Sequence, residues 1–79
     1  MMKTYVLMFQ ELTGEWVSVC HVAVVSWLYY SDVIRYAEEC LLVGKCDGCY
    51  VGNRCVVYRV DDQAMFVLVL KDGVVEVYD

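Results

Sequence analysis

The 79-residue chain contains no proline and one histidine, and its six basic residues are scattered along it. With no proline, low-complexity run or internal repeat, nothing marks a linker, so residues 1–79 are expected to form a single domain. Direct nucleic-acid binding requires clustered lysine and arginine, and the scatter of these side chains disfavours it. The basic residues are Lys3, Arg35, Lys45, Arg54, Arg59 and Lys71.

The chain also lacks the residue patterns of common catalytic sites. There is no Ser-His-Asp set, phosphate-binding glycine loop or metalloprotease motif. The one histidine, His21, follows Cys20 in a predicted strand, where consecutive side chains point to opposite faces, so these two cannot form a catalytic pair with each other. We therefore expect no enzymatic activity.

Long uncharged segments are missing as well. The longest stretch without formal charge, residues 16–31, is shorter than the roughly 20 apolar residues of a membrane helix. The apolar run after Lys3 ends at Gln10 and Glu11, too early for a signal peptide. We expect a cytoplasmic protein, in a host cell's cytoplasm if a virus encodes it. Thiols there are mostly reduced, which favours metal binding or packing over disulfides.

Apolar residues, by contrast, are abundant: 61% of the chain is hydrophobic, and its formal net charge is −5. Soluble domains usually contain about 45–50% apolar residues, and a domain this small cannot bury such a surplus. Some of it should contact a second copy, as a homodimer, or another protein. The acidic surface suits a basic partner, such as a protein that itself binds nucleic acid.

The hydrophobic pattern predicts an α+β fold, an antiparallel sheet of about five strands with one helix packed on one face, in the order β-β-α-β-β-β. Ser31 is the predicted N-cap of the helix and Gly44 its C-terminal stop. Thr13-Gly14 and Asp72-Gly73 are turn signals, and a short extra strand is predicted near Tyr50. The main predicted strands are residues 3–12, 15–25, 53–60, 63–70 and 73–79.

Strict alternation in the second strand places two sets of side chains on opposite faces. One set is Val17, Val19, His21, Ala23 and Val25. One helix cannot cover both sides of a five-stranded sheet, so the uncovered face is where we expect the surplus apolar surface to lie.

The stretch CDGCYVGNRC, residues 46–55, contains a C-x-x-C pair, the spacing that lets two thiolates reach one zinc ion. The candidate zinc ligands are Cys40, Cys46, Cys49 and Cys55. One C-x-x-C is half of a common zinc signature, and buried cysteines often act as small apolar residues. The stretch is therefore interpreted as a turn region, with zinc binding as the alternative.

The exposed side of the helix and the acidic turn after the third predicted strand are the predicted partner-binding surface. Tyr36 is the strongest single candidate, because its spacing places it off the helix's apolar stripe and tyrosine is a common interface anchor. The full set is Asp32, Arg35, Tyr36, Glu38, Glu39, Asp61 and Asp62.

In size and character the chain is similar to small phage or mobile-element proteins, anti-CRISPR proteins among them, that bind and block a host machine. The similarity rests on an acidic domain without a catalytic set and with surplus aromatic and apolar surface. It implies a non-enzymatic inhibitor that works by steric occlusion or acidic mimicry. A small zinc-stabilised interaction domain is the alternative, and a thiol redox protein is a further one.

Overall fold

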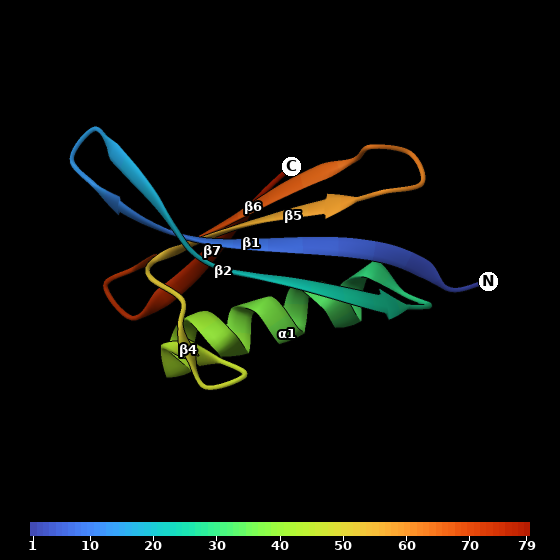
Figure 1. The fold of residues 1–79 in the computed structure, drawn as a ribbon, viewed down its shortest axis with the longest axis horizontal. Helices are drawn as coiled ribbons and strands as arrows, with labels where there is room; N and C mark the ends of the chain where they lie inside the picture. The colour runs from blue at the N-terminus through green and yellow to red at the C-terminus, as the bar shows by residue number, and fades with distance from the viewer.

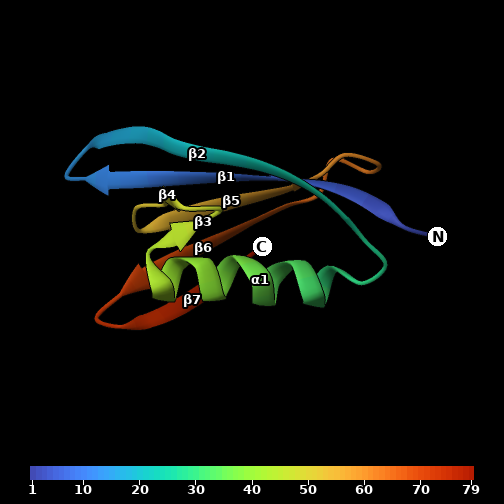
Figure 2. The same ribbon diagram turned by 60° about the horizontal axis from the view of Figure 1, so that its bottom comes forward.

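Five β-branched and aromatic segments pair into one antiparallel sheet with the strand order β2-β1-β5-β6-β7. The computed structural model describes all residues, 1–79, and confirms the predicted α+β fold with one helix on one face of the sheet (Figures 1 and 2). The strands are β1 (Lys3–Thr13), β2 (Trp16–Trp27), β5 (Arg54–Arg59), β6 (Met65–Lys71) and β7 (Val74–Tyr78).

Helix α1 (Tyr30–Val43) follows β2 and lies against the sheet through its apolar stripe. The predicted N-cap is wrong: Ser31 lies inside the first turn, and Tyr29 is the N-cap residue without a side-chain cap hydrogen bond. The predicted stop is confirmed, because Gly44 adopts a left-handed conformation (φ 90°) and donates its N–H to the Cys40 carbonyl at 2.8 Å. The protein has no helix with the length and apolar character needed to span a membrane.

The predicted short strand near Tyr50 exists, but it belongs to a separate two-stranded hairpin. Strand β3 (Lys45–Cys46) pairs with β4 (Cys49–Tyr50), and Asp47-Gly48 forms the turn between them. Both turn residues have positive φ, 51° and 78°, the combination required by the two-residue turn that suits a hairpin. The Asp72-Gly73 turn between β6 and β7 has the same pair of positive φ angles, 53° and 77°.

The core lies between α1 and the helix-facing side of the sheet. In β1 every second side chain points into it, so Tyr5, Leu7 and Phe9 are almost fully buried. Val33, Ala37 and Leu41 of α1, Cys55 and Val57 of β5, and Leu68 of β6 complete its central part.

A β-bulge interrupts β2 and changes which residues share a face. Phe9 pairs with His21, but the next residue, Gln10, pairs with Val19, so Cys20 is the extra residue. The predicted alternation is therefore wrong before the bulge: His21 shares a face with the core residues of β1, whereas Val19 lies on the face with Gln10. The bulge thus transfers an apolar side chain to the uncovered side.

Candidate functional site

The side of the sheet away from α1, here called the open face, carries mostly apolar side chains. Direct pairing across the strands places them in rows, such as Val24-Val6-Tyr58-Met65 and Val22-Met8-Val56-Val67-Tyr78. No helix or loop covers this face, as the sequence predicted. Its apolar members include Val6, Met8, Val19, Val22, Val24, Val56, Tyr58, Met65, Val67, Val69, Val74 and Tyr78.

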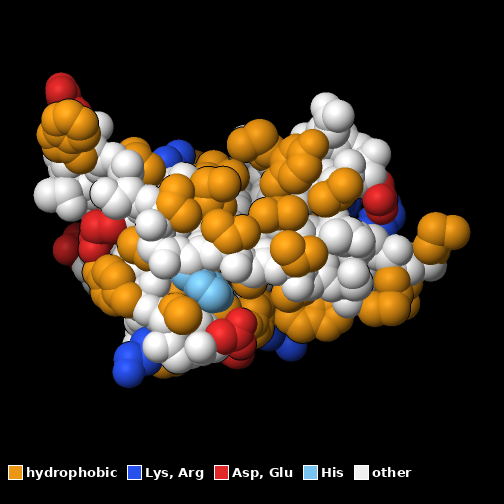
Figure 3. All heavy atoms as spheres, viewed as in Figure 1, with side chains coloured by type: hydrophobic (Ala, Val, Ile, Leu, Met, Phe, Trp, Pro, Cys, Tyr) orange, Lys and Arg blue, Asp and Glu red, His pale blue; other side chains and the backbone are white.

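The open face is hollowed at its centre. A depression of about 350 Å³ is lined by Val6, Met8, Gln10, Val56, Tyr58 and Met65. Figure 3 shows hydrophobic side chains gathered in the broad dip between the two raised ends of the molecule. Met65, which lines the depression, retains 54% of its accessible surface, and Val24, which pairs with the lining residue Val6, retains 67%.

Few charged groups lie on the open face. Arg54 donates a hydrogen bond from Nη1 to Oε1 of Gln10 at 3.0 Å, and Gln10 is itself nearly buried. Glu76 lies in the same row, separated from Arg54 by Val69, and accepts a hydrogen bond from Tyr78. With Arg54, Glu76 and, at the end of β6, Lys71 as its charges, the open face has none of the acidic excess of the molecule as a whole.

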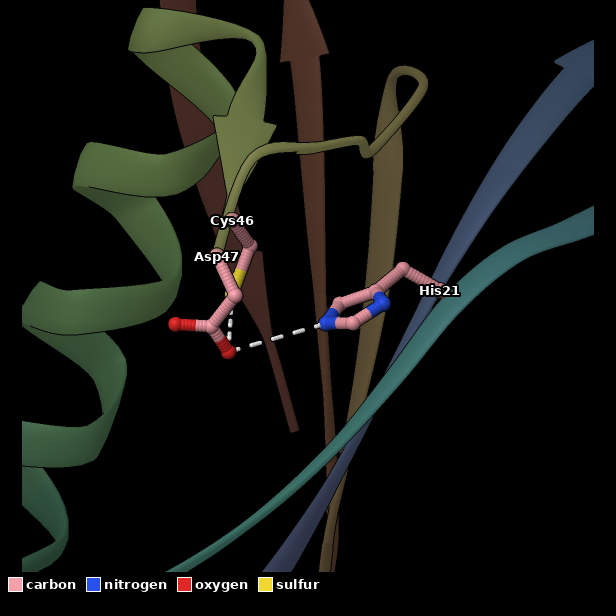
Figure 4. Close-up of side chains that lie close together, drawn as sticks. All are labelled: His21, Cys46 and Asp47. Atoms are coloured by element: carbon pink, nitrogen blue, oxygen red, sulfur yellow. Dashed lines mark hydrogen bonds and ion pairs between the residues drawn. The ribbon is translucent and has the colours of Figure 1, made fainter.

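A second feature lies on the helix-facing side, where His21 of β2 meets the β3–β4 hairpin (Figure 4). Nε2 of His21 is 3.8 Å from Oδ2 of Asp47, and Sγ of Cys46 is 3.9 Å from the same oxygen. These three ligand atoms all lie within 4.8 Å of one another. Nε2 of His21 is buried and has no hydrogen-bond partner.

Tyr36 and Cys40 of α1 border this group. The Tyr36 hydroxyl is 3.2 Å from Sγ of Cys46, and this hydrogen bond, with burial and the nearby Cys40, raises the pKa of Tyr36. Burial and the neighbouring Cys46 raise the pKa of the Cys40 thiol to about 12. Cys40 is therefore a protonated thiol at neutral pH and a poor nucleophile.

The four cysteines predicted as zinc ligands do not form one ligand set. Cys46 belongs to the group with His21 and Asp47, while Cys49, its partner across the hairpin, is exposed. Cys55 is completely buried in β5, and that burial raises the pKa of its thiol to about 12. All five cysteines are free thiols. Sequence reasoning missed His21 and Asp47 as members of the group.

The predicted partner-binding residues are divided between two places. Asp32, Arg35, Glu38 and Glu39 lie on α1, and all but the half-buried Glu38 are exposed. Tyr36 turns inward instead, packing edge-on against Trp27 at 5.3 Å between ring centres. The remaining two, Asp61 and Asp62, lie in the β5–β6 turn, away from α1 (Figure 1).

Asp62 is engaged within the chain. Its carboxylate accepts two hydrogen bonds from Arg59, at 2.7 and 2.6 Å, and one from the Ala64 N–H at 3.2 Å. The hydrogen bonds from Arg59 lower the pKa of Asp62 to about 2. Within the predicted set, Asp61 and the carboxylates of α1 thus remain available to a partner.

The buried Cys55 thiol should make the protein less stable in alkali. The unfolded chain releases this proton near pH 9, whereas the folded chain holds it until about 12, so stability falls as pH rises through this window. The expected slope is about 1.4 kcal/mol per pH unit from this thiol. Urea unfolding in reducing buffer at about pH 8 and about pH 10.5 measures it.

Two variants identify the source of that slope. Cys55→Ala should show a shallower loss of stability with rising pH than the parent protein. Cys49→Ser, which changes an exposed thiol, should keep the parent slope. Equal slopes in all three proteins would mean that the buried thiol does not cause the loss.

No protein-family model matches the chain, and no match was found among curated proteins or among solved structures.

Proposed function

We propose that this protein acts by binding other protein chains rather than by catalysis, and that a second copy of the chain covers its open face. The observation that carries the proposal is a continuous apolar surface spread over all five strands of the sheet. Apolar patches larger than a few hundred Å² are rare on monomeric soluble proteins and mark interaction sites. Leaving this face in water would also promote non-specific aggregation.

The charge distribution supports a second copy as the occupant. The chain has a net charge of −5, yet the open face contributes Arg54, Lys71 and Glu76, a net charge of +1. A strongly basic partner would gain no electrostatic attraction here, whereas two such faces repel one another only weakly. The helix side and the turns carry the rest of the acidic charge.

The shape and size of the open face are also suitable. Two sheets pack face to face about 10 Å apart, with their side chains interdigitating, and side chains of the partner would fill the central depression. Its apolar side chains, several of them more than half exposed, extend over all five strands, and a standard interface buries roughly 800 Å² on each partner.

This arrangement leaves α1 free on both outer sides of the dimer. Asp32 and Glu39 are exposed on α1, on the opposite side of the sheet from the proposed interface. A dimer would present this acidic surface twice, and two linked copies bind a repeated or extended basic target more tightly than one. We propose on this basis that the protein blocks a basic partner, such as a nucleic-acid-binding protein, by occluding its surface.

The dimer is tested by placing charge on the open face. In the double variant Val24→Lys/Met65→Lys, both changes fall on half-exposed side chains, so the fold should persist. Dimerisation would bury two unpaired ammonium groups per chain, which is costly. Sedimentation equilibrium should give a dimer for the parent and a monomer for the variant, with matching far-UV circular dichroism.

The matched control is Leu42→Lys, which charges a side chain of similar exposure (51%) on the helix. It should remain a dimer. A monomeric parent protein at tens of micromolar would overturn the proposal, as would dissociation of the control variant. A monomer that binds an apolar small molecule in the central depression would reassign the open face to ligand binding.

A further inference from the structure

The side-chain group at the β3–β4 hairpin has the composition of a metal site. We propose that His21, Cys46 and Asp47 bind one divalent transition-metal ion, Zn²⁺ by their chemistry. An imidazole nitrogen, a thiolate and a carboxylate are the ligand types found around zinc in proteins. Mg²⁺ and Ca²⁺ prefer all-oxygen sites and would gain nothing from Cys46 or His21.

The distances are close to those of a tetrahedral zinc site. With bonds of about 2.0–2.3 Å, neighbouring ligand atoms around zinc lie about 3.3–3.6 Å apart. Here Oδ2 of Asp47 lies 3.8 Å from Nε2 of His21 and 3.9 Å from Sγ of Cys46. A contraction of a few tenths of an ångström would bring the carboxylate oxygen to this spacing from both atoms, while the third pair, Nε2 of His21 and Sγ of Cys46, lies within 4.8 Å. Asp47 is exposed on a hairpin turn, where such a movement meets little resistance.

The state of His21 is an independent observation that points to a ligand. Its Nε2 atom is buried and lacks any hydrogen-bond partner, an arrangement that costs free energy unless something satisfies the atom. The ring stacks on Phe9, with centres 6.2 Å apart and planes at 24°. Figure 4 shows Nε2 directed toward the Asp47 carboxylate. A bound cation would satisfy the nitrogen, the thiolate and the carboxylate together.

The surrounding residues suit a thiolate ligand. The Tyr36 hydroxyl, 3.2 Å from Sγ of Cys46, can donate a hydrogen bond to the thiolate once the proton leaves on metal binding. Three protein ligands leave a fourth position for water or for an atom of a bound partner. The metal would fasten the β3–β4 hairpin to β2, so that binding would add to the stability of the fold.

Co²⁺ and Zn²⁺ are the probes for the full chain, first stripped with a chelator and kept in reducing buffer. We expect one Co²⁺ per chain, a near-ultraviolet thiolate-to-cobalt absorption band and displacement of Co²⁺ by Zn²⁺. Zn²⁺ should also raise the melting temperature, because it binds the folded chain preferentially.

Asp47→Asn is the most informative variant, because asparagine tolerates the positive φ of 51° at this position and keeps the shape of the side chain. It should weaken Co²⁺ binding by about tenfold or more, and His21→Gln should do the same. The control Cys49→Ser removes an exposed thiol two residues away and should leave the affinity unchanged.

Two results would overturn the assignment. One is the failure of the stripped parent protein to take up Co²⁺ or Zn²⁺ at about a hundred micromolar. The other is loss of binding in Cys49→Ser with retention in His21→Gln and Asp47→Asn, which would identify a site made by the cysteines. Neither result affects the proposed dimer, since the group and the open face lie on opposite sides of the sheet.

Discussion

Replacing Gly52 with alanine should lower the free energy of unfolding by about 3 kcal/mol or more. Gly52 has a φ of +71°, where a side chain costs roughly 1–2 kcal/mol. A Cβ atom there would lie 2.3 Å from the carbonyl oxygen of Gln10 and 2.7 Å from its carbonyl carbon. Both contacts are with the backbone of β1, so relief requires the strand or the turn to move.

That movement would disturb the attachment of the turn to β1. The neighbouring Asn53 donates its backbone N–H to the Gln10 carbonyl at 3.0 Å. Its side chain accepts a hydrogen bond from the Leu12 N–H at 2.9 Å and donates one to the Leu12 carbonyl at 3.0 Å. These three hydrogen bonds are all made by the residue that follows Gly52, so a movement that relieves the added methyl group would also strain them. Equilibrium urea unfolding measures the combined loss of stability.

Gly73→Ala is the matched control. Gly73 has a similar φ of +77°, but a Cβ atom there would have no atom within 4 Å. It should therefore show only the conformational cost, about 1–2 kcal/mol. If the two variants lost equal stability, the close approach of Gly52 to β1 would not be a feature of the folded protein.

Local signals in the sequence located most of the elements correctly. The Asp72-Gly73 turn and the Gly44 stop depend on conformations that few residues adopt, so each identifies its place without knowledge of the rest of the fold. The count of one helix against five strands was enough to predict an uncovered sheet face. These features follow from short-range rules and from simple geometry.

The errors occurred where tertiary contacts override local preference. Ser31 is a good capping residue, but the helix begins at Tyr30, whose ring stacks on Phe66 of β6 at 5.5 Å between centres. The first turn of the helix thus packs against the sheet and begins without a side-chain cap, so tertiary packing outweighs the local preference for Ser31. The bulge at Cys20 has no turn residue to announce it, so the alternation of β2 could not be followed past it.

The group of His21, Cys46 and Asp47 shows the same limit. His21 and Asp47 are far apart in sequence and meet only because α1 leads the chain back across the sheet. The available signal was that the alternation grouped His21 with Ala23 and Val25 on one face of the strand, but nothing local indicated that the helix and the hairpin cover this face. The C-x-x-C spacing drew attention to Cys49 instead, which the hairpin leaves exposed.

Phe9→Ala should be the most damaging substitution in the core, with an expected loss of about 3–5 kcal/mol. Phe9 has no exposed surface, and its removal leaves a cavity between the sheet and α1. Small domains of this size have a total stability of roughly 4–12 kcal/mol, so the variant would be close to unfolding. Phe9→Leu retains most of the volume and should lose much less, which keeps the cavity explanation testable by urea unfolding.

Met8, the residue before Phe9 in β1, lies on the other side of the sheet, so Met8→Ala compares a substitution on the open face with one in the core. Met8 points to the open face and is partly exposed, so Met8→Ala should cost less than about 1 kcal/mol in the isolated monomer. At concentrations where the chain dimerises, the same variant should weaken association, because Met8 lines the central depression. Phe9→Ala should instead lose stability at every concentration. A loss for Met8→Ala as large as that for Phe9→Ala in dilute monomer would show that the open face is already covered within one chain, which would leave a second copy nothing to cover.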